Sequence, residues 1–345
     1  MPITRAYAQA AEPGNFFVAG KNKIINGDFN INQRAFSSTT TNGTFGFDRW
    51  LFTCVSGTVT YSAQTFTPGT APVAGYESKN FSRIITTGQS ATNSIGLYRQ
   101  AIEDVRTLAG QTATVSFWAK ADSGTPKIAI NLAQIFGTGG SSAVYNYAGQ
   151  VTLSTSWARY SVTITLPSVS GKTISATDSY LHLEMWVSAG SDFNSRTGSL
   201  GIQSNTFDIW GVQVEAGSVA TPFTTATGTL AGELAACQRY YWRRSATGRT
   251  TLGNGVGESS TTAWIVFGFP TEMRAVPTTV EWSGLTVSDG VSYTETVTSI
   301  NGATLSANRS YGRITFTTAG NIVQNRVAVG ETASGGGHFA LGAEL

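Results

Sequence analysis

Two segments of the chain carry tryptophan and ionisable side chains at alternate positions. In residues 114–120, Trp118 and Lys120 lie on the side opposite the apolar residues. In residues 181–187, the corresponding side carries His182, Glu184 and Trp186. Aromatic rings stack on the C–H faces of sugars, and the donors and acceptors of the other side chains pair with sugar hydroxyls. These five residues are the candidate glycan-binding site, provided that the two segments are neighbouring strands of one sheet.

A tryptophan on the polar side of a strand has a second explanation. A ring in this position is unexpected if the face only meets water. The same face would bury its tryptophans if it packed against a second domain or a neighbouring subunit. The sequence leaves both interpretations open. A Trp186→Ala variant that lost binding but kept its melting temperature would favour the glycan face.

The chain has few of the residues that catalysis usually needs. Its two histidines are His182 and His338, and it contains no G-x-S-x-G, H-E-x-x-H or P-loop motif. Acidic residues such as Glu184 and Asp208 could supply the carboxylate pair of a glycosidase, but nothing in the sequence sets their separation. We therefore expect no enzymatic activity.

The composition indicates an all-β protein. Thr, Val and aromatic residues, which suit pleated strands, are abundant, and only 12% of the residues are charged. The formal net charge of +2 and the scattered Lys and Arg residues do not provide the basic surface that nucleic acid requires. No window has the continuous apolar run of a secretion signal or a membrane span. We expect neither nucleic-acid binding nor membrane insertion. The two cysteines, Cys54 and Cys237, cannot form a disulfide framework.

Residues 24–224 are predicted to form a jelly-roll β-sandwich. Short segments with alternating apolar residues are separated by clusters of Gly, Ser, Asn and Pro. About nine such strands are enough for two packed sheets. The predicted strands are residues 47–53, 58–66, 79–87, 94–102, 114–120, 127–135, 160–166, 181–187 and 206–215.

The remaining parts of the chain differ from this pattern. Four apolar residues recur at helical spacing within residues 225–241, which predicts a short helical linker. Residues 242–345 are predicted to form a smaller antiparallel β domain. Turn signals at Asp289–Gly290 and Asn301–Gly302 indicate a meander of hairpins. Residues 1–23 show neither helical nor strand periodicity, so we expect an extended arm that docks onto a partner.

Three pairs of short motifs bracket most of the chain. They are KIINGDFNINQR (23–34) with FDRW (47–50), QVEAGSVATPF (213–223) with ELAACQRYY (233–241), and FPTEMRAVP (269–277) with AEL (343–345). Together they resemble the non-enzymatic fibre, tail and capsid-decoration proteins of tailed bacteriophages. The resemblance leaves residues 1–22 uncovered, and it identifies a class of virion protein without a position on the virion.

The resemblance implies a structural protein of the phage particle, made in the host cytoplasm and assembled into the virion. Our leading hypothesis is a fibre or adhesin that contacts a host-surface glycan. One alternative is a capsid-decoration or head-fibre protein that binds only other virion subunits, and another is the carbohydrate-binding module of a hydrolase. Fibres of this class are usually trimeric, so we expect a homotrimer whose residues 1–23 contact other virion proteins.

The start of the predicted sandwich also resembles carbohydrate-binding jelly rolls, which often hold a structural calcium between the first turn and a carboxylate of the last strand. The corresponding ligands here are the carbonyl of Gly27 and the carboxylate of Asp208. Asn30 stands where such modules tend to carry an acid, which weakens the site because calcium favours charged oxygen ligands. The alternative is that Asp208 pairs with a nearby side chain.

Overall fold

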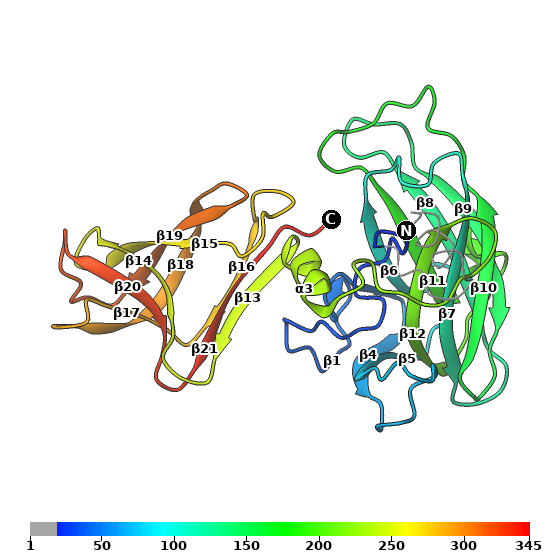
Figure 1. Ribbon diagram of the computed structural model, residues 1–345, viewed down its shortest axis with the longest axis horizontal. Helices are drawn as coiled ribbons and strands as arrows, with labels where there is room; N and C mark the ends of the chain where they lie inside the picture. Colours follow the sequence, from blue (N-terminus) through cyan, green and yellow to red (C-terminus); the bar gives the residue numbers. More distant parts are fainter. Residues whose placement is uncertain (1–18) are drawn as a thin grey trace, which may run out of the picture. The chain divides into compact units, whose positions relative to one another are not determined.

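The computed structural model describes residues 19–345, which divide into two compact units (Figure 1). The first unit contains residues up to Asn30, Ser37–Gly46 and Trp50–Glu233. The second contains Ile31–Phe36, Phe47–Arg49 and Leu234–Leu345. Two short segments that the sequence assigns to the sandwich therefore belong to the second unit. Among residues 19–345, no helix is both long and apolar enough to cross a membrane.

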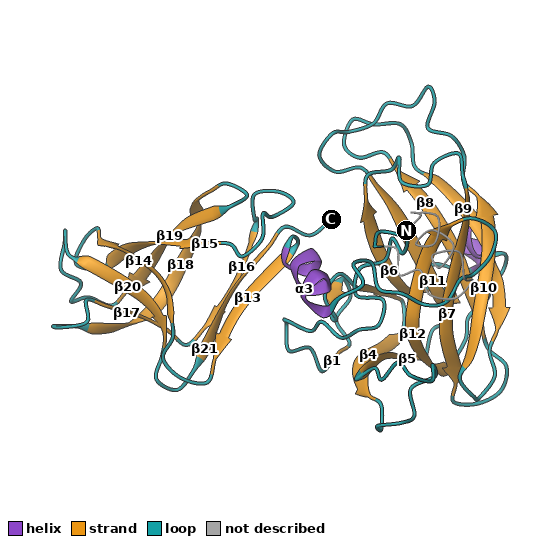
Figure 2. Ribbon diagram, viewed as in Figure 1, coloured by secondary structure: helices purple, strands orange, loops and turns teal. Residues whose placement is uncertain are grey.

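The first unit is a sandwich of two six-stranded antiparallel sheets, as the sequence predicted, and strands dominate it (Figure 2). Sheet A has the order β1 (Ser38–Thr39), β4 (Thr58–Thr65), β5 (Asn80–Thr87), β12 (Asn205–Ala216), β7 (Thr112–Ala121) and β10 (Ala158–Thr165). Sheet B has the order β2 (Thr44–Phe45), β3 (Leu51–Val55), β6 (Ile95–Glu103), β11 (Tyr180–Ala189), β8 (Lys127–Ile135) and β9 (Val144–Thr152).

The apolar side of each alternating segment lies in the core between the sheets. Val115 and Phe117 of β7 are fully buried, and so are Leu183 and Met185 of β11. Successive side chains of a strand point to opposite faces, so the polar side of each segment lies on an outer face of the sandwich. The prediction that alternate residues of these two strands face the core is confirmed.

Residues 19–23 are part of the first unit, although the sequence placed them in an arm that ends at residue 23. The buried side chain of Asn22 donates to the carbonyls of Val212 and Thr224 and accepts from the amide of Val214. The amide of Lys23 also donates to the carbonyl of Val214. These bonds attach the segment to β12, so the prediction is corrected for residues 20–23, whereas residues 1–18 of the arm lie outside the described residues.

The second unit contains a closed six-stranded barrel and a three-stranded sheet. The barrel order is β14 (Thr251–Gly257), β15 (Thr262–Gly268), β19 (Tyr311–Thr318), β18 (Thr294–Ala307), β17 (Leu285–Ser288) and β20 (Val327–Thr332). The sheet order is β13 (Tyr241–Ala246), β21 (Gly337–Gly342) and β16 (Thr279–Ser283). Two predicted features differ: β20 and β21 pair with strands distant in sequence, so the unit is no simple meander, and Asn301–Gly302 lies within β18.

The predicted short helix is present as α3 (Leu230–Gln238). The side-chain hydroxyl of Thr229 accepts from the amide of Gly232, three residues on, which caps the start of the helix. Cys237 in this helix and Cys54 in β3 are both buried, so each occupies its place as a small apolar side chain.

Candidate functional site

The five candidate glycan-binding residues do not converge. Trp118 and Lys120 lie on β7 in sheet A, whereas His182, Glu184 and Trp186 lie on β11 in sheet B. Because the alternate residues of both strands fill the core, the two sets point away from each other on opposite outer faces. The expected single patch is therefore wrong, and the two sets form separate surfaces.

On sheet A, Trp118 and Lys120 are held by neighbouring side chains. The ring of Trp118 packs edge-on against Trp210 at a centroid distance of 5.3 Å, and the guanidinium carbon of Arg159 lies 4.6 Å from its centroid. The ammonium of Lys120 lies 3.6 Å from a carboxylate oxygen of Asp208. These contacts favour the structural interpretation of both residues over the glycan-binding one.

The residues proposed as calcium ligands do not fit a metal ion. Both carboxylate oxygens of Asp208 accept from the guanidinium of Arg83, at 2.7 and 2.8 Å, and Lys120 adds a second positive charge. The carbonyl of Gly27 accepts from the amide of Val212, four residues along β12 from Asp208. The calcium prediction is therefore corrected, and the local pairing of Asp208 is the observed arrangement. Among residues 19–345 no group of three or more His, Cys, Asp and Glu side chains could hold a metal.

On sheet B, the strand register sets polar and aromatic side chains side by side. Glu184 lies between Arg99 of β6 and Asn131 of β8, and Asn131 is opposite Tyr147 of β9. The next row has His182 opposite Ala133, followed by Tyr145, and Trp186 lies in the row beyond Glu184. Neighbouring positions of one face are in contact across a sheet. We call this outer surface the β11 face.

Trp186 is buried within the β11 face and cannot stack on a ligand. Its side chain is 1% exposed, and its ring lies 5.0 Å from that of Phe193 in the short helical turn η1 (Ser191–Phe193). Its Nε1 donates to Glu184 at 3.1 Å, and Glu184 in turn accepts from Arg196 of α2 (Asn194–Thr197) at 2.5 Å. Trp186 is therefore buried, as the alternative interpretation of the sequence expected. The segment that covers it belongs to the same unit and not to a second domain or subunit.

His182 is neutral although it lies 3.6 Å from Glu184. Burial lowers the pKa of His182 well below its usual value, and the positive charges of Arg99 and Arg196 lower that pKa further. The charge of Glu184 is already balanced by its bond with Arg196. The histidine therefore offers a neutral donor and acceptor to the β11 face rather than a positive charge.

The exposed rings of the β11 face come from β9, which the sequence analysis did not identify as a strand. Tyr145 is 46% exposed and Tyr147 is 38% exposed. The guanidinium carbon of Arg196 lies 3.8 Å from the ring centroid of Tyr145, so the ring is fixed on one side and open on the other. The spacing of Tyr145 and Tyr147, two residues apart between polar or small residues, was the signal in the sequence.

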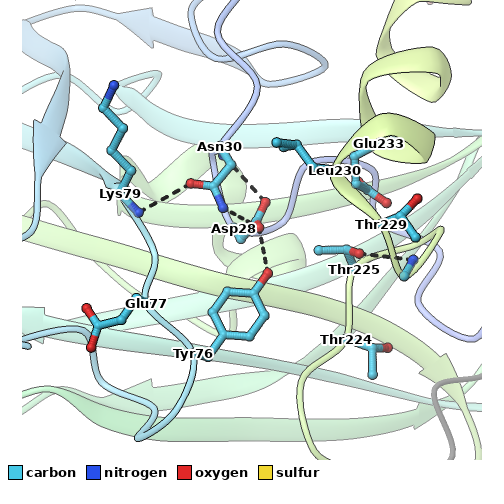
Figure 3. Close-up of a pocket in the computed structure, with 11 residues that line it drawn as sticks. Asp28, Asn30, Tyr76, Glu77, Lys79, Thr224, Thr225, Thr229, Leu230 and Glu233 are labelled. Carbon is cyan, nitrogen blue, oxygen red and sulfur yellow. Dashed lines mark hydrogen bonds between the residues drawn. The ribbon is translucent and has the colours of Figure 1, made fainter.

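A pocket of about 390 Å³ lies elsewhere in the first unit (Figure 3). Its two buried carboxylates come from Asp28 near the start of the sandwich and Glu233 in the first turn of α3. Tyr76 donates from its hydroxyl to Asp28 at 2.7 Å. The remaining wall residues are Asn30, Glu77, Lys79, Thr224, Thr225, Gly228, Thr229 and Leu230. None of the predicted site residues lines this pocket.

One family model matches part of the first unit. A family model described as a carbohydrate binding domain matches residues 73–190. The match runs from the loop before β5 to the end of β11, so it includes β9 with its exposed tyrosines. It supports a carbohydrate-binding module in the jelly-roll part of the chain. No curated protein sequence matches the chain.

Several solved structures are similar to the chain at low identity. A xylan-binding domain from Paenibacillus barcinonensis has 20% identity and a TM-score of 0.33, covering 51% of this chain and 94% of its own. A family 11 carbohydrate-binding module from Clostridium thermocellum has 11% identity and a TM-score of 0.32, and the match covers 53% of this chain and 98% of the module. A putative sugar binding protein from Bacteroides thetaiotaomicron has 14% identity and a TM-score of 0.33, covering 57% and 100%.

Proposed function

We propose that the chain is a non-enzymatic glycan-binding protein whose ligand lies on the β11 face. The observation that carries this proposal is the pair of exposed rings, Tyr145 and Tyr147, beside the buried polar group of His182 and Glu184. Exposed rings on one face of a strand suit the apolar side of a sugar, and the buried Glu184 fixes the arginine that stacks on Tyr145. The family match over residues 73–190 supports the same ligand class.

Arg196 prepares this face for binding. Its guanidinium is fixed by Glu184 on one side and stacks on Tyr145 on the other, so both side chains have lost much of their rotamer freedom before a ligand arrives. Ordering a flexible side chain on binding costs about 0.5–1.5 kcal/mol. A ring that is already ordered avoids this cost, which favours binding of a sugar ring against it.

Affinity electrophoresis of the full chain in gels that contain soluble xylan or mixed-linkage β-glucan tests the proposal. We expect Tyr145→Ala and Tyr147→Ala to restore the mobility seen without polysaccharide, because each removes a stacking surface worth about 1–3 kcal/mol. The matched control is Tyr311→Ala, since Tyr311 is an exposed tyrosine of the second unit. Retardation that survives both β9 variants would contradict the proposal.

We further propose that the protein is a fibre or adhesin of a tailed-phage particle, made in the host cytoplasm and assembled into the virion. The support is the resemblance of the bracketing motifs, together with the contacts among their side chains. Gln33 contacts Asp48, and Arg34 contacts Glu344. Electron microscopy of gold-labelled virions tests this: label on the tail is expected, label on the capsid would favour the decoration alternative, and unlabelled virions would contradict both.

We also propose a homotrimer in which residues 1–18 contact other virion proteins. Each sheet of the sandwich ends in edge strands, and a sheet edge favours pairing with another chain unless a neighbour covers it. Light scattering at micromolar concentration should give about three times the chain mass of 36.3 kDa. A mass near that of one chain would overturn the trimer and leave glycan binding unaffected.

A further inference from the structure

Two buried carboxylates of the first unit lack a positive partner. Among residues 19–345, six carboxylates are buried, and four of them lie within 4 Å of a Lys or Arg nitrogen. The four pairs are Asp48 with Arg34, Glu184 with Arg196, Asp208 with Arg83, and Glu215 with Lys21. The other two, Asp28 (3% exposed) and Glu233 (2% exposed), line the same pocket.

Neutral groups hold both of these carboxylates in place. Asp28 accepts from the hydroxyl of Tyr76 and the amide of Asn30, each at 2.7 Å. Glu233 accepts from the backbone amides of Asn26 and Thr227, also at 2.7 Å. Such bonds orient the oxygens but leave the negative charge in the pocket, and a buried charge without a counter-charge is costly.

The surroundings of Glu233 also disfavour its charged form. Burial raises the pKa of Glu233, and the charge of Asp28 adds to this rise, while the backbone and hydroxyl bonds oppose it. A positive ligand between the two groups would stabilise both charged forms. The carboxylates are therefore arranged for a cation that the described part of the chain does not supply.

The lysine in the pocket wall does not fill this role. Lys79 is exposed, and Figure 3 shows its ammonium directed away from Asp28 and Glu233. Glu77 at the rim is also exposed and adds a third carboxylate. The lining thus contains three carboxylates and one outward ammonium, which favours positive ligands over neutral or negative ones.

The size of the pocket indicates an organic ligand. One water needs roughly 10–15 Å³ of such space, whereas binding pockets for small molecules begin near about 300 Å³. At about 390 Å³ the pocket accepts a ligand of sugar size. Thr225 and Thr229 contribute hydroxyl groups to its wall, and the ring of Tyr76 offers an apolar edge.

We propose that this pocket binds an amino sugar through its protonated amine, which lies between Asp28 and Glu233 while the sugar hydroxyls face the threonines. The ammonium follows from the two buried carboxylates, which are hydrogen-bonded to neutral groups but have no positive partner. The sugar part of the ligand rests on the proposed glycan-binding function. The site is separate from the β11 face, because no residue of that face lines the pocket.

Isothermal titration calorimetry of the full chain tests the proposal with matched probes. The probes are the fully deacetylated glucosamine tetramer, its N-acetylated counterpart, ethanolamine, and calcium chloride. We expect the deacetylated tetramer to bind at least tenfold more tightly than the other three, because only it combines an ammonium with sugar rings. Equal affinity for the acetylated tetramer would overturn the ammonium, and equal affinity for ethanolamine would overturn the sugar.

Variants at the pocket separate a local effect from unfolding. Asp28→Asn should weaken binding of the deacetylated tetramer at least tenfold. Since this buried change could also unfold the chain, the exposed rim supplies a second pair: Glu77→Gln should weaken binding two- to threefold, and Lys79→Gln should strengthen it by a similar factor. Unchanged affinity in both rim variants would overturn the proposal, as would a calcium affinity that exceeds that of the tetramer.

These experiments can contradict the proposal for the β11 face and the proposal for the pocket separately. Tyr145→Ala should leave the affinity for the deacetylated tetramer unchanged while it abolishes retardation by neutral polysaccharides. If binding of the tetramer depends on the rim charges but no neutral polysaccharide retards the chain, the proposal for the β11 face is wrong and the proposal for the pocket is supported. If neutral polysaccharides are retarded through β9 and the tetramer does not bind, the pocket is wrong and the proposed function stands.

Discussion

The guanidinium of Arg49 forms an ion pair with the carboxylate of Glu344, 295 residues further along the chain. The side chain of Arg49 is 1% exposed, and its guanidinium carbon lies 3.4 Å from the ring centroid of Tyr240. Arg34 contacts the same carboxylate at 3.1 Å and stacks on Tyr241. The motifs that bracket the sequence therefore meet in one polar cluster of the second unit, and their side chains serve the fold.

This cluster predicts a large loss of stability when Arg49 is replaced. Arg49→Gln should lower the free energy of unfolding by about 3 kcal/mol, because removing one partner leaves a poorly solvated charge and an uncovered ring. Arg49→Lys should recover part of the loss, since it keeps the charge without the planar group. Urea unfolding followed by tryptophan fluorescence measures both.

The control for Arg49 is Arg106→Gln, which breaks the exposed pair with Asp104. An exposed pair contributes at most about 1 kcal/mol. Equal unfolding midpoints for Arg49→Gln and Arg106→Gln would show that the cluster contributes no more than a surface pair.

Trp186 should behave as a core residue. Trp186→Ala should lower the free energy of unfolding by about 3–5 kcal/mol, because it removes a large ring from a closed environment beside Phe193. Tyr145→Ala, at an exposed position of the same face, should change it by less than about 1 kcal/mol. Thermal unfolding distinguishes the two, and a Trp186→Ala protein with unchanged melting temperature would refute the burial.

Gly27 should tolerate no side chain. A Cβ atom there would overlap the backbone carbonyl of Val212, whose amide donates to the carbonyl of Gly27. Gly27→Ala should therefore lower the melting temperature by several degrees, equivalent to about 1–3 kcal/mol. Gly268→Ala is the matched change, because nothing lies within 4 Å of a Cβ at that position. A smaller effect at Gly27 than at Gly268 would contradict the close contact between the backbones of Gly27 and Val212.

His182 predicts a loss of stability in mild acid. Its pKa in the folded chain is well below the unfolded value of about 6.5, so below that pH the unfolded chain binds a proton that the folded chain does not. Protons then favour the unfolded state, and the free energy of unfolding should fall as the pH decreases from 6.5, by up to about 1.4 kcal/mol per unit.

Urea unfolding at pH 7.0 and pH 5.5 measures this slope. His182→Asn should reduce the difference between the two pH values. His338→Asn is the comparison, because burial also lowers the pKa of His338 but its side chain is half-buried and bonded to Ser283. A slope that is unchanged by His182→Asn would mean that the acid sensitivity arises elsewhere.

The sequence predicted individual strands better than their partners. Alternation identified β7 and β11, because burial of every second residue is a local property of a strand. It could not assign them to different sheets, since that depends on pairings between distant strands such as β12 with β7. The helix α3 lies within the segment for which apolar spacing predicted a helix. Residues 31–36 were misassigned because their partners lie beyond residue 233.

The candidate sites were harder to predict for a related reason. Glu184 and Trp186 were singled out as ligand groups, but the segment that covers them, η1 and α2, carries no pattern that announces its position. The pocket joins Asp28 to Tyr76 and to the first turn of α3, and only the folded chain brings these together. Polar residues of a strand thus indicate which face is outward, and not whether that face is free.

The division of the second unit has a consequence for synthesis on the ribosome. Residues 31–36 and 47–49 emerge early, but the rest of their unit begins at Leu234. At roughly 5–20 residues per second, Arg49 is exposed for about 15–60 s before Glu344 is made. During that interval the sandwich can close around its own core while its inserted segments stay unpaired. The order of translation therefore makes the second unit the last to be completed, and a pause or truncation after residue 233 leaves Arg34 and Arg49 without their partners in the second unit.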